Sequence, residues 1–416
     1  MMLWLYCTFF SFAFAEDSGV DLSDTVSGKK APELRVDDIA LPSKDIFDDE
    51  YSGLYPQRIY DGAKWLKMSP DFVWGCWLIM EGLYKRDWNE LEQSIKKVRM
   101  YYPNSGVATA GEALKYQVMM LENFDFRYEK EYDQKYKEAM QELAEAQMMP
   151  GNDAWEYFLS GAMMGVDGIH AMRKEEWLRA INRGYNGVVT IAKARELAPE
   201  FIDAELGDGL WYYWRSLIAM NIPGIPKYKD QRKEGIQMML KAERQSVFLR
   251  PAAAHALTYT WIEEGNKPNA IQTAETLREV YPNNIINLQV LGRAYMYAQQ
   301  YQKSEEAFQK VIEIDKDNHR VHYYLARLYM RQKRFQDAEE RLKHYLSFDL
   351  MPLHEGYAHY YLGRLYQSQH LLEKAEAEYK TAYKIAEIKN ALQRANYVRS
   401  KIDKKETNKQ ETEQEE

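Results

Sequence analysis

Three arginines recur at a nearly regular spacing in the C-terminal part of the chain. Arg293 and Arg327 lie 34 residues apart, and Arg364 follows 37 residues after Arg327. Arginine presents a planar fork of N–H donors that suits a carboxylate, and a nearby tyrosine adds flat area and a hydroxyl. If the spacing reflects stacked structural units, these groups would align along one channel. The pattern then predicts a binding site for an extended acidic or aromatic segment of a partner.

The same spacing runs through the small and aromatic residues around these arginines. A leucine paired with a small residue recurs at Leu257-Thr258, Leu291-Gly292, Leu325-Ala326 and Leu362-Gly363. Three residues after the small residue comes a large aromatic, and twelve residues after it comes another small one; these positions are Trp261, Tyr295, Tyr329 and Tyr366, then Ala270, Ser304, Ala338 and Ala375. Because spacings of three and four share one helix face, each unit is expected to be two closely packed helices.

At these residues the chain resembles the tetratricopeptide repeat, a helix–turn–helix unit of about 34 residues. The resemblance implies an all-α fold, a right-handed α-solenoid, with four units at about 251–284, 285–318, 319–355 and 356–390. It also implies that Arg293, Arg327 and Arg364 face a concave groove, together with the residues four positions earlier, which are Gln289, Tyr323 and Tyr360. Arg320, Arg331 and Tyr357 are expected nearby.

The rest of the chain divides around this block. Residues 57–250 are expected to form a degenerate helical region of the same kind, and a capping helix is expected to end near 402. Residues 403–416 have almost no apolar side chains and predict a charged disordered tail.

Charge is unevenly distributed along the chain, whose net charge is -8. Residues 16–56 are expected to form an acidic flexible arm, because residues 16–50 hold eleven acids and four bases. Residues 319–400 hold fourteen bases and nine acids. This asymmetry suggests the hypothesis that the arm occupies the groove in cis and is displaced by a partner. The overall acidic balance disfavours nucleic acid as the partner.

The first fifteen residues carry no charge and end in Ala13-Phe14-Ala15. An apolar stretch closed by this pattern predicts a signal peptide cleaved before Glu16, although no basic residue precedes it. We therefore expect an exported protein, periplasmic or associated with the cell envelope. No later apolar run approaches the length of a membrane span, so none is expected in the mature chain.

The sequence offers little for catalysis. It lacks the glycine-rich phosphate loops and the nucleophile elbow of common enzymes. His354 and His359 are five residues apart, which places them on different helix faces, and His319 and His322 lack a third ligand at a matching spacing. We therefore expect no catalytic residue, no metal site and no cofactor.

Two functions remain open at this point. The first is a non-enzymatic scaffold or adaptor of the envelope that binds a protein or peptide in the groove. The alternative is a carrier of a small apolar ligand, or an accessory component of envelope transport or assembly, using the aromatic-rich N-terminal half. The run from Trp211 to Trp214 is the densest aromatic feature there, and inter-helix core is its simpler interpretation.

Overall fold

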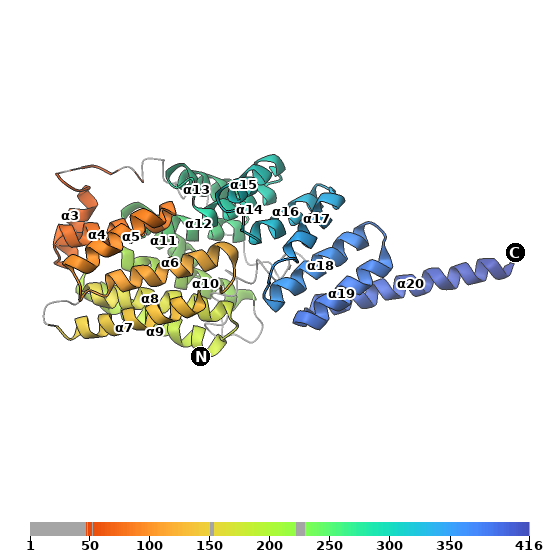
Figure 1. Ribbon diagram of the computed structural model, residues 1–416, viewed down its shortest axis with the longest axis horizontal. Coiled ribbons are helices and arrows are strands. Elements are labelled where there is room, and N and C mark those ends of the chain that lie inside the picture. The colour runs from red at the N-terminus through yellow and green to blue at the C-terminus, as the bar shows by residue number, and fades with distance from the viewer. Residues whose placement is uncertain (1–46, 48, 52, 150–153, 222–228, 416) are drawn as a thin grey trace.

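The computed structural model describes residues 47, 49–51, 53–149, 154–221 and 229–415. Within them the chain is a stack of paired helices, so the predicted all-α solenoid is confirmed (Figure 1). The N-terminal half contains α3 (Gln57–Leu66), α4 (Pro70–Lys85), α5 (Trp88–Tyr101), α6 (Val107–Asn123), α7 (Glu129–Gln147), α8 (Ala154–Arg173), α9 (Trp177–Leu197), the short 3₁₀ helix η3 (Ile202–Ala204), α10 (Glu205–Asn221) and α11 (Arg232–Gln245).

The repeat block follows, with four helix pairs and a terminal helix. It contains α12 (Arg250–Glu263), α13 (Lys267–Val280), α14 (Ile285–Tyr297), α15 (Tyr301–Ile314), α16 (Arg320–Arg331), α17 (Phe335–Tyr345), α18 (Pro352–Ser368), α19 (Leu372–Ala386) and α20 (Lys389–Glu415). We use "first helix" for α12, α14, α16 and α18, which also contact one another in that order.

Small residues let the two helices of a unit approach closely. A Cβ atom added to Gly363 would lie 2.6 Å from the buried ring of Tyr379, and one added to Gly292 would overlap the ring of Phe308. The same device operates in the N-terminal half, where a Cβ on Gly235 would meet the Gly209 carbonyl oxygen at 2.6 Å. The Gly-Asp-Gly sequence at 207–209 therefore serves helix packing.

The turn inside each unit repeats at the level of the backbone. Seven residues after each small residue the chain adopts a positive φ between 61° and 73°, at Gly265, Gln299, Lys333 and His370. Only one of the four residues is glycine, the residue that usually marks a positive φ, so this turn could not be recognised from the sequence. Arg86, Phe124 and Glu175 take the same conformation after α4, α6 and α8. The two regions of the chain thus share one type of helical hairpin.

Hydrogen bonds from tyrosine to glutamate join each unit to the one before it. Tyr329 donates to Glu305 at 2.7 Å, and Tyr366 donates to Glu339 at 2.8 Å. Tyr295 makes the corresponding contact with Glu275. These tyrosines are the aromatic residues of the sequence repeat. Their recurrence in the sequence therefore arises from contacts between consecutive helix pairs.

The two regions are joined by buried polar contacts as well as by the chain. The Asp203 carboxylate accepts the backbone N–H groups of Val247, Phe248 and Leu249 at 2.7–3.0 Å, just before α12 begins. The Tyr281 hydroxyl donates to Glu81 at 2.9 Å. The start of the repeat block is therefore fixed against α4 and η3.

The two ends of the described chain differ from the sequence expectation. Residues 403–415, expected to be disordered, continue α20, which projects beyond the body (Figure 1). Earlier in α20, Ala391, Ala395, Val398 and Ile402 are buried. The last part of the acidic arm is in contact with the body, because Asp49 pairs with Arg58 at 2.7 Å and with Arg250 at 3.5 Å. The signal-peptide prediction, most of the arm and its binding in cis fall on residues 1–46, outside the described residues.

Candidate functional site

The three arginines at the repeat spacing lie on successive first helices and are linked by tyrosine rings. Arg327 stacks over the rings of Tyr323 and Tyr361, and Arg364 stacks over the same Tyr361 at 5.5 Å. Arg293 stacks over Tyr259 and Tyr324. We call this alternation of guanidinium groups and tyrosine rings the Arg–Tyr ladder. Its members lie on α12, α14, α16 and α18, and they are Tyr259, Arg293, Tyr324, Tyr323, Arg327, Tyr361 and Arg364.

The ladder is more buried than a binding groove would require. Arg293 is 4% exposed and Arg327 8%, whereas Arg364 is partly exposed. Of the other residues assigned to the groove from the sequence, Gln289, Arg320, Tyr323, Tyr357 and Tyr360 are buried. Much of the predicted site therefore packs inside the protein.

Arg331 and its surroundings form the accessible end of the ladder. Arg331 is exposed and lies 5.4 Å from the ring centre of Tyr297, which is partly buried. Burial tends to raise the pKa of the Tyr297 phenol, but Arg327, Arg293 and Arg331 together lower that pKa below its ordinary value. The direction of this pKa change follows from the three guanidinium groups that surround the phenol.

The positive end continues onto the terminal helix. Arg394 of α20 donates to the Tyr360 hydroxyl at 3.0 Å. Within the described part of the chain, neither Arg331 nor Arg364 is joined to a carboxylate; each is in contact with a tyrosine ring. We define the open end of the ladder as its accessible residues Arg331 and Arg364 with their ring partners Tyr297 and Tyr361; the two guanidinium groups favour a negatively charged ligand.

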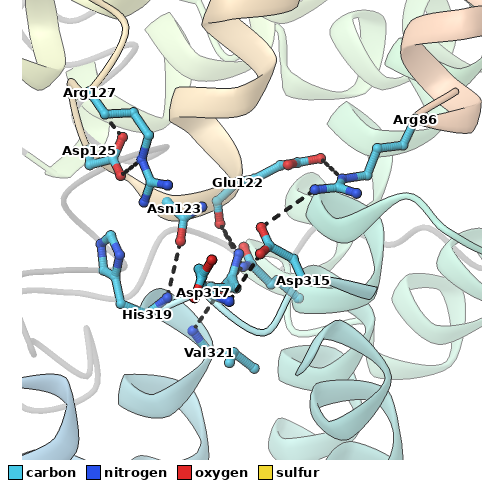
Figure 2. A network of polar contacts seen from close by, with 11 residues as sticks. Arg86, Glu122, Asn123, Asp125, Arg127, Asp315, Asp317, His319 and Val321 are labelled. Carbon is cyan, nitrogen blue, oxygen red and sulfur yellow. Dashed lines mark hydrogen bonds and ion pairs between the residues drawn. The ribbon is translucent and has the colours of Figure 1, made fainter. Parts of the chain in front are cut away.

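On the side where α14 and α16 begin, the repeat block meets the N-terminal half, and Figure 2 shows this contact around Glu122, Asn123 and His319. The turn after α6, here called the α6–α7 corner (residues 122–125), contacts the starts of α14 and α16. The Glu122 carbonyl oxygen accepts from the amides of Gln289 and Asn318, both at 2.9 Å. Asn123 Oδ1 accepts the backbone N–H of His319 at 3.1 Å. Gln289, predicted to meet a partner, thus binds a segment of its own chain.

A small charge cluster borders the corner. Arg86 donates to the Glu122 carboxylate at 2.8 Å and approaches Asp315 at 3.5 Å, so one guanidinium lies between two carboxylates (Figure 2). Burial raises the pKa of Glu122 to about 7, although Arg86 opposes the rise. The raised pKa places the protonation of Glu122 near neutral pH, beside the boundary between the two regions.

Arg320 lies between the corner and the ladder. Its guanidinium is 4.8 Å from the rings of both Phe124 and Tyr323, and it is 1% exposed. His354 of α18 lies within 3.2 Å of the same guanidinium. The sequence placed Arg320 near the ladder but could not reveal Phe124 as its neighbour.

The histidine pairs do not form a metal site in the described residues, where no group of three or more metal-ligating side chains is present. His359 contacts Glu378 at 2.6 Å, away from His354, whose Nδ1 lies 3.1 Å from the Tyr345 hydroxyl. His322 lies beside Arg341 at 3.1 Å. These contacts give each histidine a local packing role.

The aromatic run in α10 belongs mainly to the core. Tyr213 and Trp214 are buried, and the Tyr213 hydroxyl donates to Glu264 of the repeat block at 2.9 Å. This arrangement favours packing between helices over a ligand site for that run. In the described ranges, no helix combines the length and apolarity needed to cross a bilayer.

Sequence reasoning missed the corner, Tyr297, Tyr361 and Arg394. Tyr297 and Arg331 hold the same position in successive units, five residues after Gly292 and Ala326, so the repeat spacing could have identified Tyr297. Nothing local marks Glu122 and Asn123 as neighbours of His319, because about two hundred residues separate them.

Comparison with known proteins supports the repeat assignment. Residues 295–350 match a sequence model described as tetratricopeptide repeat. No curated protein sequence matches the chain significantly.

Solved structures resemble the fold at low sequence identity. A human IFIT1 dimer with m7Gppp-AAAA is 13% identical, with a TM-score of 0.52 over 88% of each chain. A human IFIT1 dimer with PPP-AAAA is 12% identical, with a TM-score of 0.48 over 84% of this chain and 76% of that one. Yeast Tom70 is 14% identical, with a TM-score of 0.43 over 79% of this chain and 74% of that one. These likenesses concern the fold.

Proposed function

We propose that the chain is a non-enzymatic scaffold that binds an extended partner segment at the open end of its Arg–Tyr ladder. What supports this is the match of residues 295–350 to the tetratricopeptide repeat, because domains of that kind generally mediate protein–protein interactions. The observation that carries the proposal is the pair of accessible arginines, Arg331 and Arg364, held on the rings of Tyr297 and Tyr361 respectively. Their positive potential favours a segment rich in carboxylates.

The burial of the ladder changes which residues should be tested. Replacing Arg293 or Arg327 with glutamate would place a carboxylate inside the protein and disturb folding as well as binding. Arg331 is exposed and Arg364 partly exposed, so their side chains can change with less structural cost. Arg331→Glu combined with Arg364→Glu is therefore the informative variant.

Site-specific crosslinking tests the proposal. A photo-reactive phenylalanine analogue placed at Arg331 should capture a partner through an acidic or aromatic peptide, identified by mass spectrometry. The same analogue at Glu340, exposed on α17, serves as the matched control. Arg364→Glu should remove the adduct formed from position 331. Equal adducts from positions 331 and 340 would refute the proposed site.

The proposed setting is the cell envelope, and what supports it is the uncharged stretch ending in Ala13-Phe14-Ala15. Mass spectrometry of the chain purified from its native cell should find Glu16 as the first residue. A chain that keeps residues 1–15 and fractionates with cytosolic proteins would contradict this setting and leave the binding site unaffected.

A further inference from the structure

The α6–α7 corner is held by contacts of the kind that bind a peptide. Two side-chain amides, from Gln289 of α14 and Asn318 before α16, converge on the single carbonyl oxygen of Glu122. Both amides are buried and depend on this carbonyl oxygen as an acceptor, although Gln289 also donates to Asn318 Oδ1 at 3.3 Å. The repeat block therefore contacts the corner through a backbone atom, the Glu122 carbonyl oxygen.

Asn123 supplies a cap to a helix in the other region of the chain. The first N–H groups of α16 lack partners within the helix. Asn318 satisfies the N–H of Val321 at 3.1 Å, and Asn123 satisfies that of His319 at 3.1 Å (Figure 2). Asparagine is a favoured capping residue, and here it acts across the interface. The start of α16 therefore depends on the corner.

Phe124 adds an aromatic contact and a strained backbone. Its φ is +60°, a conformation that bulky side chains rarely adopt. Its ring is contacted by Arg320 at 4.8 Å and by His354, whose ring centre is 5.4 Å away. The same φ recurs in the other hairpin turns, so what distinguishes Phe124 is its ring, which Arg320 and His354 contact from the repeat block and Arg173 of α8 contacts at 4.8 Å.

We propose that the α6–α7 corner is a ligand bound in cis, which occupies the helix-start end of the ladder and confines a partner to the open end. This inference rests on the proposed binding function, and it adds that the corner sets the length of the surface a partner can contact. Gln289 and Arg320 are engaged by the corner, whereas Arg331 and Arg364 are not. Releasing the corner would lengthen the surface available to a partner.

Asn123→Ala combined with Phe124→Ala tests the proposal in the full-length protein. Amide hydrogen exchange should become faster over residues 318–322, because the capping bond to His319 is lost. A fluorescein-labelled peptide of alternating glutamate and tyrosine serves as the probe, measured by fluorescence anisotropy at low salt. Its affinity should rise by roughly threefold or more, because the surface at the starts of α14 and α16 that the Asn123 and Phe124 side chains cover becomes available to it.

Two further variants keep the result interpretable. Gln289→Ala removes one donor to the corner but leaves Asn123 and Phe124 in place, so a smaller increase in exchange and no rise in affinity are expected. Lys130→Ala changes an exposed residue of α7 and should alter neither exchange at 318–322 nor affinity.

Each outcome decides the proposal. Faster exchange together with tighter binding supports the cis-bound corner. Unchanged exchange, or faster exchange without tighter binding, overturns it. If crosslinking from position 331 succeeds while the corner variant leaves affinity unchanged, only this inference fails. If crosslinking also fails, the proposed binding function fails with it.

Discussion

The N-terminal half and the repeat block use the same hairpin, yet only the block shows a regular sequence period. In both, a residue with positive φ ends the first helix, and a glycine permits close approach of the second. The N-terminal half varies its helix lengths, from 10 residues in α3 to 21 in α9, whereas the first helices α12, α14 and α16 hold 12 to 14. Helices of nearly constant length keep equivalent residues at a fixed spacing in the sequence. The hairpin itself needs only the positive-φ turn and the close helix contact, so it persists where helix lengths vary.

The largest expected effect tests whether the two regions unfold together. Phe308 is fully buried in the block, so Phe308→Ala should cost about 3–5 kcal/mol of unfolding free energy. Trp261 is the one tryptophan after residue 250, so tryptophan fluorescence reports mainly on the N-terminal half, whereas circular dichroism reports on all helices.

If the interface at the corner couples the regions, both signals should shift to the same lower midpoint in a urea titration. Phe158→Ala, in the N-terminal half, is the matched change. Two separate transitions in either variant would show that the regions are energetically independent.

A smaller effect concerns pH at the boundary between the regions. Because the folded-state pKa of Glu122 is raised from 4.5 to about 7, the folded chain binds this proton more tightly than the unfolded chain. This stabilisation is complete below pH 4.5 and is lost as pH rises through 7.

Glu122→Gln should remove this pH dependence, which we expect to amount to about 3 kcal/mol of unfolding free energy between pH 4.5 and 7.5. Denaturant unfolding at several pH values measures it. Asp315→Asn removes the second carboxylate of the same cluster and should lower the pKa of Glu122, which moves the slope to lower pH. A slope that survives in Glu122→Gln would assign it to another group.

The smallest expected change in unfolding free energy concerns the turn residue with positive φ, which can be replaced by glycine in each of the two regions. Lys333→Gly should stabilise the block by about 0.5 kcal/mol, since glycine relieves the positive φ but adds unfolded-state entropy. Arg86→Gly occupies the equivalent turn but should destabilise the protein, because Arg86 is bonded to Glu122.

Thermal unfolding of the two glycine variants measures both changes. Stabilisation by both would mean that the contacts of Arg86 contribute little. Destabilisation by both would mean that backbone strain at Lys333 is small.

Periodicity predicted the stacked helices because small and aromatic residues at fixed spacing report contacts between neighbours. It placed Arg293, Arg327 and Arg364 on one ladder, and the cation–π contacts join them there. It could not predict how far they are buried, because exposure depends on what covers them. For Gln289 and Arg320 that cover is the distant α6–α7 corner, which no local pattern reveals.

The corner also affects how the chain reaches its native state. Contacts in a simple repeat array are local, so folding can spread from unit to unit. The bond between Asn123 and His319 spans 196 residues, which raises the mean sequence separation of native contacts and slows folding. During synthesis, α6 is complete long before α16 exists, so Asn123 and the side of the Phe124 ring that meets Arg320 lack their partners until then. The emerging N-terminal half is therefore the stage at which a chaperone would be most useful.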